Sequence, residues 1–289
     1  MSAAERLLGR IVDYAGLFPP AALSMESAVE NYQRYLVGDF GWILGGFLVP
    51  ASRLEEFSAA FEKACCGERE APWTLNIVCA GDNADDVRAI QDFQQGAVFI
   101  GSLETKAADA RAAKEMLERL PAARARYVEF PPERAVEVLP VLADYGAWAK
   151  IRMSGVTAES VPSSQVVARF LLQCVRERVA WKATAGLHHA VRGVREVAPG
   201  GPRVAMHGFV NLFLAGAQAF YGADEKALVR TLNEEDASAF RADDDVLRWQ
   251  DDNVLIVDQV EKVRNEFAIS FGSCSFDEPV DDVKAMGWI

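Results

Sequence analysis

Eight short apolar runs recur along the chain, and segments with the periodicity of amphipathic helices separate most of them. This alternation is typical of parallel β-strands that are covered by helices, and it constrains the fold more than any other feature of the sequence. We predict strands at residues 10–14, 42–49, 73–79, 97–103, 125–130, 148–153, 179–184 and 267–271.

Helical segments lie between consecutive strands, and most of them begin with Ser, Asn or Pro, residues that favour a helix start. The chain has 289 residues, close to the roughly 250 residues of a closed α/β barrel. Eight strands joined by helical crossovers favour one (β/α)8 TIM-type barrel over an open doubly wound sheet. The predicted helices span residues 24–36, 52–64, 83–93, 107–120, 132–145 and 163–178.

The regular alternation stops after the seventh predicted strand. Residues 200–266 contain an apolar helical segment at 207–221, an acidic stretch at 236–252 and a second helical segment that begins at Asn253. No Pro-rich or Ser-rich linker marks a domain boundary. We therefore predict a single domain over residues 1–289, in which residues 200–266 form an insertion-like helical region within an elaborated seventh crossover.

Composition narrows the class of partner and the compartment. The formal net charge of −12 disfavours a surface for nucleic acids or anionic membranes, so we expect a small-molecule partner. Five cysteines without C-x-x-C spacing indicate free thiols in a reducing compartment. No signal-peptide core and no membrane-span length is found, which predicts a cytoplasmic protein. A homo-oligomer is compatible with these features.

Polar side chains at the carboxyl ends of the predicted strands are the best site candidates, because active sites of such barrels form there. Glu104 and Glu129 end the fourth and fifth strands, Lys150 and Arg152 lie on the sixth, and Lys182 lies on the seventh. Neighbouring cations and burial disfavour a protonated amine, so one lysine is a candidate nucleophile or base, with the carboxylates as proton shuttles. Alternatively, the lysines form structural ion pairs with the carboxylates.

Two short segments resemble a known enzyme family. Lys150-Ile-Arg-Met-Ser-Gly155 and Lys182-Ala-Thr-Ala-Gly186 resemble the strand-six and strand-seven motifs of the deoxyribose-phosphate aldolase-like class I aldolases. The resemblance implies that Lys150 forms a Schiff base with a carbonyl substrate and that Lys182 lowers the pKa of Lys150. Arg152 stands where that family has a small residue. The whole chain also resembles a group of uncharacterised bacterial proteins, which implies no activity.

The three histidines of the chain all lie between residues 188 and 207. His188 and His189 follow the seventh strand, and His207 begins the apolar helical segment. With Glu104 or Glu129 they can form a metal site, although H-x-H and H-E-x-x-H spacings are absent. Substrate binding, acid/base catalysis and a structural role remain open for them.

Backbone features near the ends of the strands indicate further binding positions. Gly186 and the Gly272-Ser273 pair follow the seventh and eighth strands, where barrels often bind phosphate through backbone N–H groups and a short helix. A helix is predicted near residues 277–286. Residues 13–20 place Asp13, an acid/base candidate, before two prolines, either as a wall over the site or as a turn at the opposite end of the barrel.

These patterns predict an enzyme that acts on a small carbonyl-containing or anionic metabolite through a lysine imine or a lysine base. Arg152 is the expected anchor for a carboxylate or phosphate group, because its guanidinium can bind two oxygens at once. This lyase-like reaction needs no cofactor. One alternative is a metal-dependent lyase or hydrolase that uses His188, His189 and a carboxylate, and another is a binding module without catalysis.

Overall fold

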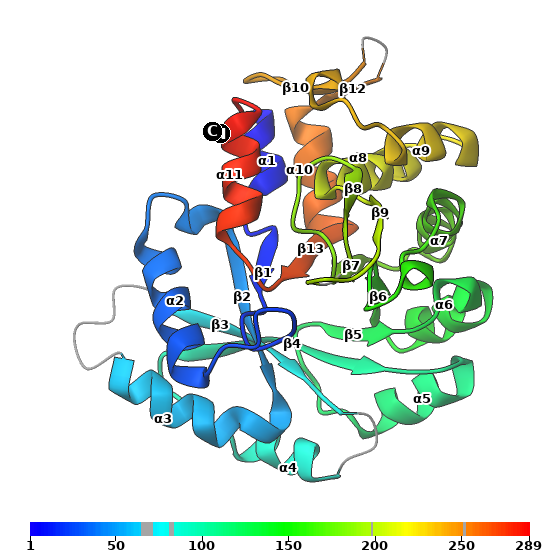
Figure 1. Cartoon of the computed structure of the whole chain (residues 1–289). Coiled ribbons are helices and arrows are strands. Elements are labelled where there is room, and N and C mark those ends of the chain that lie inside the picture. Colours follow the sequence, from blue (N-terminus) through cyan, green and yellow to red (C-terminus); the bar gives the residue numbers. More distant parts are fainter. Residues whose placement is uncertain (65–71, 81–83, 198, 251–252) are drawn as a thin grey trace.

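The computed structural model describes residues 1–64, 72–80, 84–197, 199–250 and 253–289. Its centre is a closed barrel in which every strand runs parallel to both of its neighbours. The chain is therefore a TIM-type barrel, as predicted (Figure 1). The barrel strands are β1 (Val12–Tyr14), β2 (Leu44–Pro50), β3 (Trp73–Val78), β4 (Val98–Lys106), β5 (Arg126–Glu129), β6 (Trp148–Arg152), β7 (Trp181–Thr184) and β13 (Ala268–Ser273).

Every predicted barrel strand coincides with one strand of the structure, but several ends differ. β4 continues to Lys106, so that Glu104 lies within the strand rather than after it. β1 begins only at Val12, since Arg10 has a positive φ of 53° that is incompatible with an extended strand. β13 continues to Ser273, past the predicted end at residue 271. The carboxyl ends of β4 and β13 therefore include polar residues that the apolar runs did not cover.

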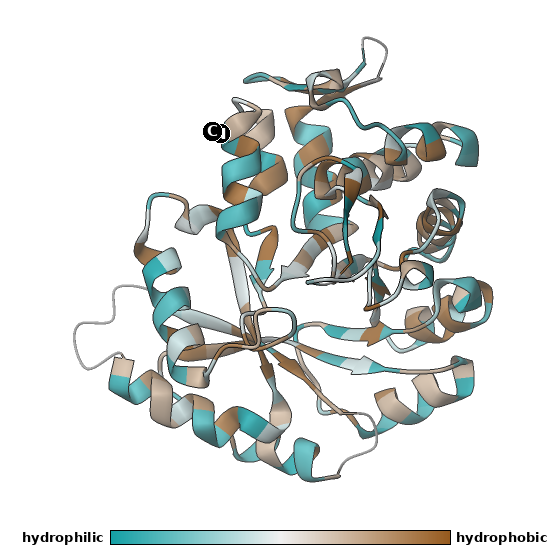
Figure 2. Ribbon diagram, viewed as in Figure 1, coloured by the Kyte–Doolittle hydropathy of each residue, from teal (hydrophilic) through white to brown (hydrophobic). Residues whose placement is uncertain are grey.

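Amphipathic helices cover the outside of the barrel, and Figure 2 shows hydrophilic and hydrophobic residues alternating along them. Ser24, Asp109 and Ser163 cap three of these helices, because their side chains accept backbone hydrogen bonds. The predicted helix start at Asn83 lies outside the described residues. The helices before β7 are α1 (Ala3–Leu8), α2 (Met25–Val37), α3 (Leu54–Ala64), α4 (Ala84–Asp92), α5 (Ala110–Arg119), α6 (Ala135–Asp144) and α7 (Ser164–Glu177), with short 3₁₀ turns at Gly41–Ile43, Ala51–Arg53, Pro132–Arg134 and Ala158–Ser160.

Residues 200–266 are more mixed than the predicted helical region. The apolar segment forms helix α8 (Phe209–Phe220), and its residues are almost entirely buried. The second predicted helix begins later than Asn253, because residues 253–256 pair as a strand instead. The remaining elements are the hairpin β8 (Gly193–Glu196) and β9 (Arg203–Met206), helix α9 (Glu225–Leu232), a 3₁₀ turn at Ala237–Ala239, the antiparallel strands β10 (Phe240–Ala242), β11 (Val246–Trp249) and β12 (Asn253–Ile256), and the helices α10 (Val257–Glu266) and α11 (Asp277–Ala285).

The apolar core lies between the barrel and its helices. Phe47 and Trp73, from β2 and β3, contact Phe57 of α3 in one continuous aromatic cluster. On the other side of the barrel, Trp181 of β7 packs against Phe213 of α8. Since side chains alternate along a strand, these outward residues leave their neighbours to fill the barrel interior.

The interior of the barrel is unusually polar for this fold, in which Val, Ile and Leu dominate. Charged side chains from five of its strands are buried there, and they form the candidate site described below. A charge inside a barrel is tolerated only when it is paired and hydrogen-bonded. Across the described residues, no helix has the length and apolar character needed to span a membrane.

Candidate active site

Four charged side chains form a continuous chain of ion pairs across the barrel interior. The Lys182 Nζ atom lies 2.6 Å from Asp13 Oδ2 and 2.6 Å from Glu104 Oε1. The Lys150 Nζ atom lies 2.7 Å from the other oxygen of Glu104, Oε2. The side chains of Lys182, Glu104 and Lys150 are 1%, 0% and 6% exposed. Glu104 therefore bridges two buried ammonium groups.

A second group of charges continues this chain toward the carboxyl ends of the strands. Lys150 Nζ lies 3.5 Å from Glu129 Oε2, and Arg152 binds Glu129 with both Nε and Nη2, at 2.7 and 3.3 Å. Lys106 Nζ lies 3.5 Å from Glu129 Oε1. Glu129 is thus the carboxylate that joins the buried lysine to two more accessible cations.

Strand register explains why residues so distant in sequence meet. Lys106 pairs with Glu129, Glu129 with Lys150, and Lys150 with Lys182, so each of β4 to β7 contributes one member of a single row. Glu104 stands two residues before Lys106 on β4, and side chains two residues apart share a face. It therefore reaches both lysines from the layer beneath the row.

The pKa values follow from these contacts. Burial alone would lower the pKa of Lys182, but the carboxylates of Asp13 and Glu104 raise it by more, so its pKa lies above the ordinary value. Burial would raise the pKa of Glu104, but Lys150 and Lys182 outweigh it and lower the pKa to about 2. Glu129 also has a lowered pKa, because Lys150 and Arg152 offset its burial. The sequence predicted a lowered pKa for one of the two lysines, and Lys182 does not have one.

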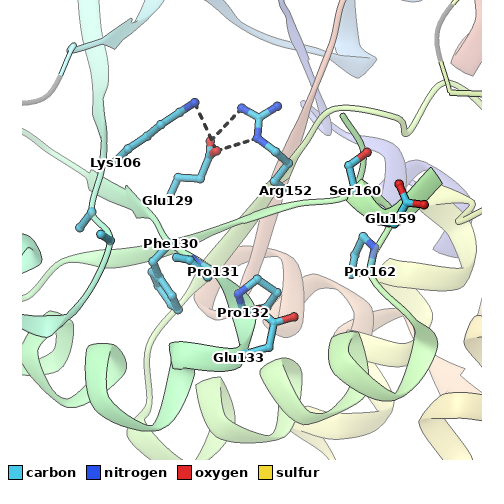
Figure 3. Close-up of a pocket in the computed structure, with 12 residues that line it drawn as sticks. Lys106, Glu129, Phe130, Pro131, Pro132, Glu133, Arg152, Glu159, Ser160 and Pro162 are labelled. Carbon is cyan, nitrogen blue, oxygen red and sulfur yellow. Dashed lines mark hydrogen bonds and ion pairs between the residues drawn. The ribbon is translucent and has the colours of Figure 1, made fainter. Parts of the chain in front are cut away.

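A cavity of about 540 Å³ opens beside the second group of charges. Figure 3 shows Glu129 at its upper wall, between Lys106 and Arg152. Glu133 and Glu159 also line it, so the cavity wall carries acidic groups in addition to Glu129. Its lining residues are Lys106, Ala107, Ala108, Glu129, Phe130, Pro131, Pro132, Glu133, Arg152, Glu159, Ser160 and Pro162.

Several supporting residues were not among the sequence candidates. Ser270 Oγ donates to Asp13 Oδ2 at 2.6 Å, and the backbone N–H of Gly46 donates to Asp13 Oδ1 at 2.7 Å. The ring of Tyr127 lies 5.2 Å from Lys182 Nζ. Lys106 and Tyr127 stand two residues from Glu104 and Glu129, so strand alternation gives a signal that identifies both. Ser270 stands two residues before Gly272 on β13, so the same alternation identifies it as well.

The histidines are not brought to the lysines. His188 Nδ1 lies 2.8 Å from Glu278 Oε2, and His189 Nδ1 lies 3.1 Å from Asp282 Oδ2, so both bind α11. His207 Nε2 bonds the carbonyl of Pro162 at 2.8 Å. Neither Glu104 nor Glu129 contacts a histidine in the hydrogen bonds or ion pairs found. Within the described ranges, no group of three or more His, Cys, Asp or Glu side chains is arranged to hold a metal ion.

The predicted glycine positions have steric and pairing roles in the structure. Gly186 has a φ of +73°, and a Cβ atom there would lie 2.4 Å from the Cβ of Ser154. Gly272 and Ser273 lie inside β13 rather than in a turn after it, and Gly272 is paired with both β1 and β7. The predicted helix that follows is α11, whose first turn holds Asp277 and Glu278. These acidic residues disfavour a phosphate at this helix start.

Asp13 lies inside the barrel, and the segment after it belongs to the carboxyl end. β1 runs parallel to its neighbours, so the residues that follow Tyr14 leave the barrel at the end where the cavity opens. Ala15 N donates to the carbonyl of Ser273 at 2.7 Å, and Leu23 N donates to that of Gly16 at 2.9 Å. The alternative of a turn at the opposite end of the barrel is wrong.

The chain has no significant match among protein-family models, curated proteins or solved structures.

Proposed function

We propose that the protein is an enzyme that acts on a small carbonyl-containing metabolite, in a lyase reaction of the class I aldolase type with Lys150 as the amine nucleophile. One observation supports this more than any other. The Nζ atom of Lys150 lies between Glu104 and Glu129, and Glu129 lines the cavity. Lys150 is therefore a buried amine whose partner Glu129 lines the cavity in which we propose that the metabolite binds.

Lys182 and Glu104 have an electrostatic role in this proposal. Lys182 is bound to Asp13 and Glu104, and its raised pKa keeps it charged near neutral pH. Glu104 has a pKa of about 2, so it remains ionised and is a weak proton acceptor. We assign Lys182 as the fixed cation beside the nucleophile, and Glu104 as the carboxylate that orients both amines.

The reaction at Lys150 follows the general chemistry of imine formation. The uncharged amine adds to the carbonyl carbon, a C–N bond forms, and the carbonyl oxygen takes up a proton. The resulting carbinolamine then loses water to give the imine. We assign the proton transfers to Glu129, since it is the carboxylate that contacts Lys150 and also lines the cavity.

Arg152 and Lys106 are proposed to bind an anionic group of the same metabolite. Both cations contact Glu129 at the wall of the cavity, and the side chain of Arg152 is 41% exposed. A guanidinium can bind a carboxylate or phosphate with two parallel hydrogen bonds. An incoming anion would exchange with Glu129 at Arg152, which would free Glu129 for proton transfer.

Reductive trapping tests this proposal. The protein is incubated with a panel of aldehydes and ketoacids, reduced with borohydride, digested, and mapped by peptide mass. We expect a stable secondary amine on the peptide that contains Lys150, and no adduct in a Lys150→Met variant. If no member of the panel gives an adduct at Lys150, the imine mechanism is excluded for the compounds tested and the proposal loses its basis.

The proposal also includes the kind of partner, which follows from composition, and the compartment, which follows from the thiols. The net charge of −12 favours a small-molecule partner over nucleic acid. Among the described residues, Cys79, Cys174 and Cys274 are free thiols, which suits a reducing compartment such as the cytoplasm. Cys65 and Cys66 lie outside the described residues.

A further inference from the structure

A thiol, an imidazole and a carboxylate are in successive contact near the carboxyl end of β13. Cys274 follows the last residue of this strand, and its Sγ atom lies 3.8 Å from His188 Nε2. The other ring nitrogen of His188, Nδ1, lies 2.8 Å from Glu278 Oε2. A nucleophile, a base and a group that orients the base are the three parts of an activated thiol.

The three residues come from separate parts of the fold. His188 lies in the connection after β7, Cys274 follows β13, and Glu278 lies in the first turn of α11. They are 86 and 90 positions apart in sequence, so no local motif reveals them. Strands β7 and β13 are neighbours in the barrel, which brings the two strand ends together.

This group differs in two respects from the other thiols and the other histidine pair. Cys79 and Cys174 are buried, and burial raises the pKa of both, whereas Cys274 is partly exposed. His189 is bound to Asp282 of the same helix, but no cysteine is among its hydrogen-bonding partners. His189 and Asp282 thus provide a matched pair with the same helix contact and no thiol.

We propose that Cys274, His188 and Glu278 form a second nucleophilic site, which adds its thiol to the carbonyl carbon of a small uncharged ligand such as an ester or an aldehyde. The site goes beyond the lysine chemistry above. In the strand order, β13 stands opposite β4, whereas the cavity next to Lys150 is lined from β4, β5 and β6. The two sites are therefore on different sides of the barrel mouth.

The proton and electron balance of the step is simple. His188 Nε2 takes the thiol proton while sulfur forms a bond to the carbonyl carbon, and the carbonyl π electrons move to oxygen. With an aldehyde, the oxygen takes the proton back from His188 to give a hemithioacetal. With an ester, the C–O bond breaks instead, and the leaving alcohol takes the proton and leaves an acyl thioester on Cys274. Glu278 acts as a positioning residue, which holds Nδ1–H of His188.

Surrounding charges favour an uncharged ligand. Asp277 and Glu278 stand at the start of α11, and Asp277 binds the hydroxyl of Tyr35 on α2 at 2.7 Å. Tyr14 of β1 also interacts electrostatically with Cys274 and Asp277, and Arg34 is the cation found near Tyr14. Carboxylates on the side of the helix oppose a second anion near the thiol.

The test uses p-nitrophenyl acetate on the full chain with Cys65→Ser and Cys66→Ser, so that the masses report on described thiols. We expect release of p-nitrophenolate and an acetyl group on the Cys274 peptide, with Cys79 and Cys174 unmodified. His188→Ala should slow acetylation about 100-fold, the typical contribution of a general base, while His189→Ala leaves the rate unchanged. Lys150→Arg, which removes the amine of the imine proposal but keeps a charge beside Glu104, should also leave the acetylation rate unchanged, and this separates the two proposals.

A positioning role for Glu278 has its own test. Glu278 is 49% exposed, so Glu278→Gln should fold, and we expect it to slow acetylation while Asp282→Asn does not. This pair decides the question if His188→Ala fails to fold. Neutral iodoacetamide should alkylate Cys274 faster than anionic iodoacetate does. The ratio of the two rates should be larger at Cys274 than for free glutathione. An absent Cys274 adduct, or equal effects of His188→Ala and His189→Ala, would overturn the proposal.

Discussion

Lys150 and Lys182 are register partners on the neighbouring strands β6 and β7, and their ammonium groups bind the two oxygens of a single carboxylate, that of Glu104. Two cations that share one buried anion are strongly coupled, because the loss of either charge changes the field at the other. Asp13 supplies the second anion for Lys182 alone. The two lysines are therefore not equivalent, although strand position makes them look alike.

Removal of the Lys182 charge should destabilise the fold. In Lys182→Met, Asp13 and Glu104 would remain buried without their common cation, and breaking a buried ion pair costs about 3–5 kcal/mol. Lys106→Met is the matched control, because the Lys106 side chain is 62% exposed and its partner Glu129 keeps the contacts with Lys150 and Arg152, so we expect a loss of about 1 kcal/mol or less. Urea unfolding measures both. Equal losses in the two variants would contradict the importance of the buried network.

Acid should destabilise the protein partly through Glu104. The pKa of this carboxyl falls from the ordinary 4.5 to about 2 in the folded chain, so the folded state holds the proton less tightly than the unfolded state. The resulting stability is present above pH 4.5 and is lost as the pH falls toward 2. We expect Glu104→Gln to be less stable at pH 7 and to show a flatter decline over this range. Unfolding curves measured at several pH values provide the comparison.

The pKa values of His207 and His188 should be shifted in opposite directions from the ordinary value of 6.5. Burial lowers the pKa of His207 from 6.5 to about 4, so His207 contributes stability that is lost as the pH falls from 6.5 toward 4. For His188, burial is outweighed by Cys274 and Glu278, and the pKa is raised above 6.5. The stability from His188 is present below pH 6.5 and is lost as the pH rises through its folded value. NMR titration of the three imidazoles, assigned with His→Gln variants, should show His207 neutral and His188 largely charged at pH 6.

Alanine at Gly186 should cost more than alanine at another left-handed glycine. Gly186 and Gly146 have φ of +73° and +58°, and a left-handed conformation costs a residue with a Cβ about 1–2 kcal/mol. A Cβ at Gly186 would also lie 2.4 Å from Ser154 Cβ, while one at Gly146 has no heavy atom within 4 Å. We expect Gly186→Ala to lower the free energy of unfolding by about 1 kcal/mol or more beyond the loss in Gly146→Ala, measured by thermal unfolding. Similar losses would show that the segment around Ser154 yields at little cost.

The barrel was predictable from the sequence because it depends on local signals. Apolar runs such as residues 73–79 and capping residues such as Ser163 report on strands and helices within a few positions. The carboxyl-end rule then selected Glu104, Glu129, Lys150 and Lys182, which the structure brings into contact. The sequence did not show which carboxylate pairs with which lysine, because this depends on the strand register. It also did not show the raised pKa of Lys182, which depends on Asp13, a residue far away in the sequence.

The groupings that failed to form were those inferred from closeness in sequence. His188, His189 and His207 lie within one short segment, yet each has a different partner, from α11 or from the loop before α7. Residues 253–256 pair with β11, although the sequence predicted the start of a helix there. Tertiary contacts decided these positions, since the local sequence is compatible with several structures.

Identifying which amine is trapped tests the assignment of Lys150 and Lys182 most directly. With an aldehyde or ketoacid that reacts, borohydride reduction of wild type, Lys150→Arg and Lys182→Arg is followed by peptide mass mapping. We predict an adduct at Lys150 in wild type, none in Lys150→Arg, and an adduct that remains at Lys150 in Lys182→Arg, because arginine keeps the fixed charge. An adduct at Lys182 in the wild-type protein would contradict the assignment of the two lysines.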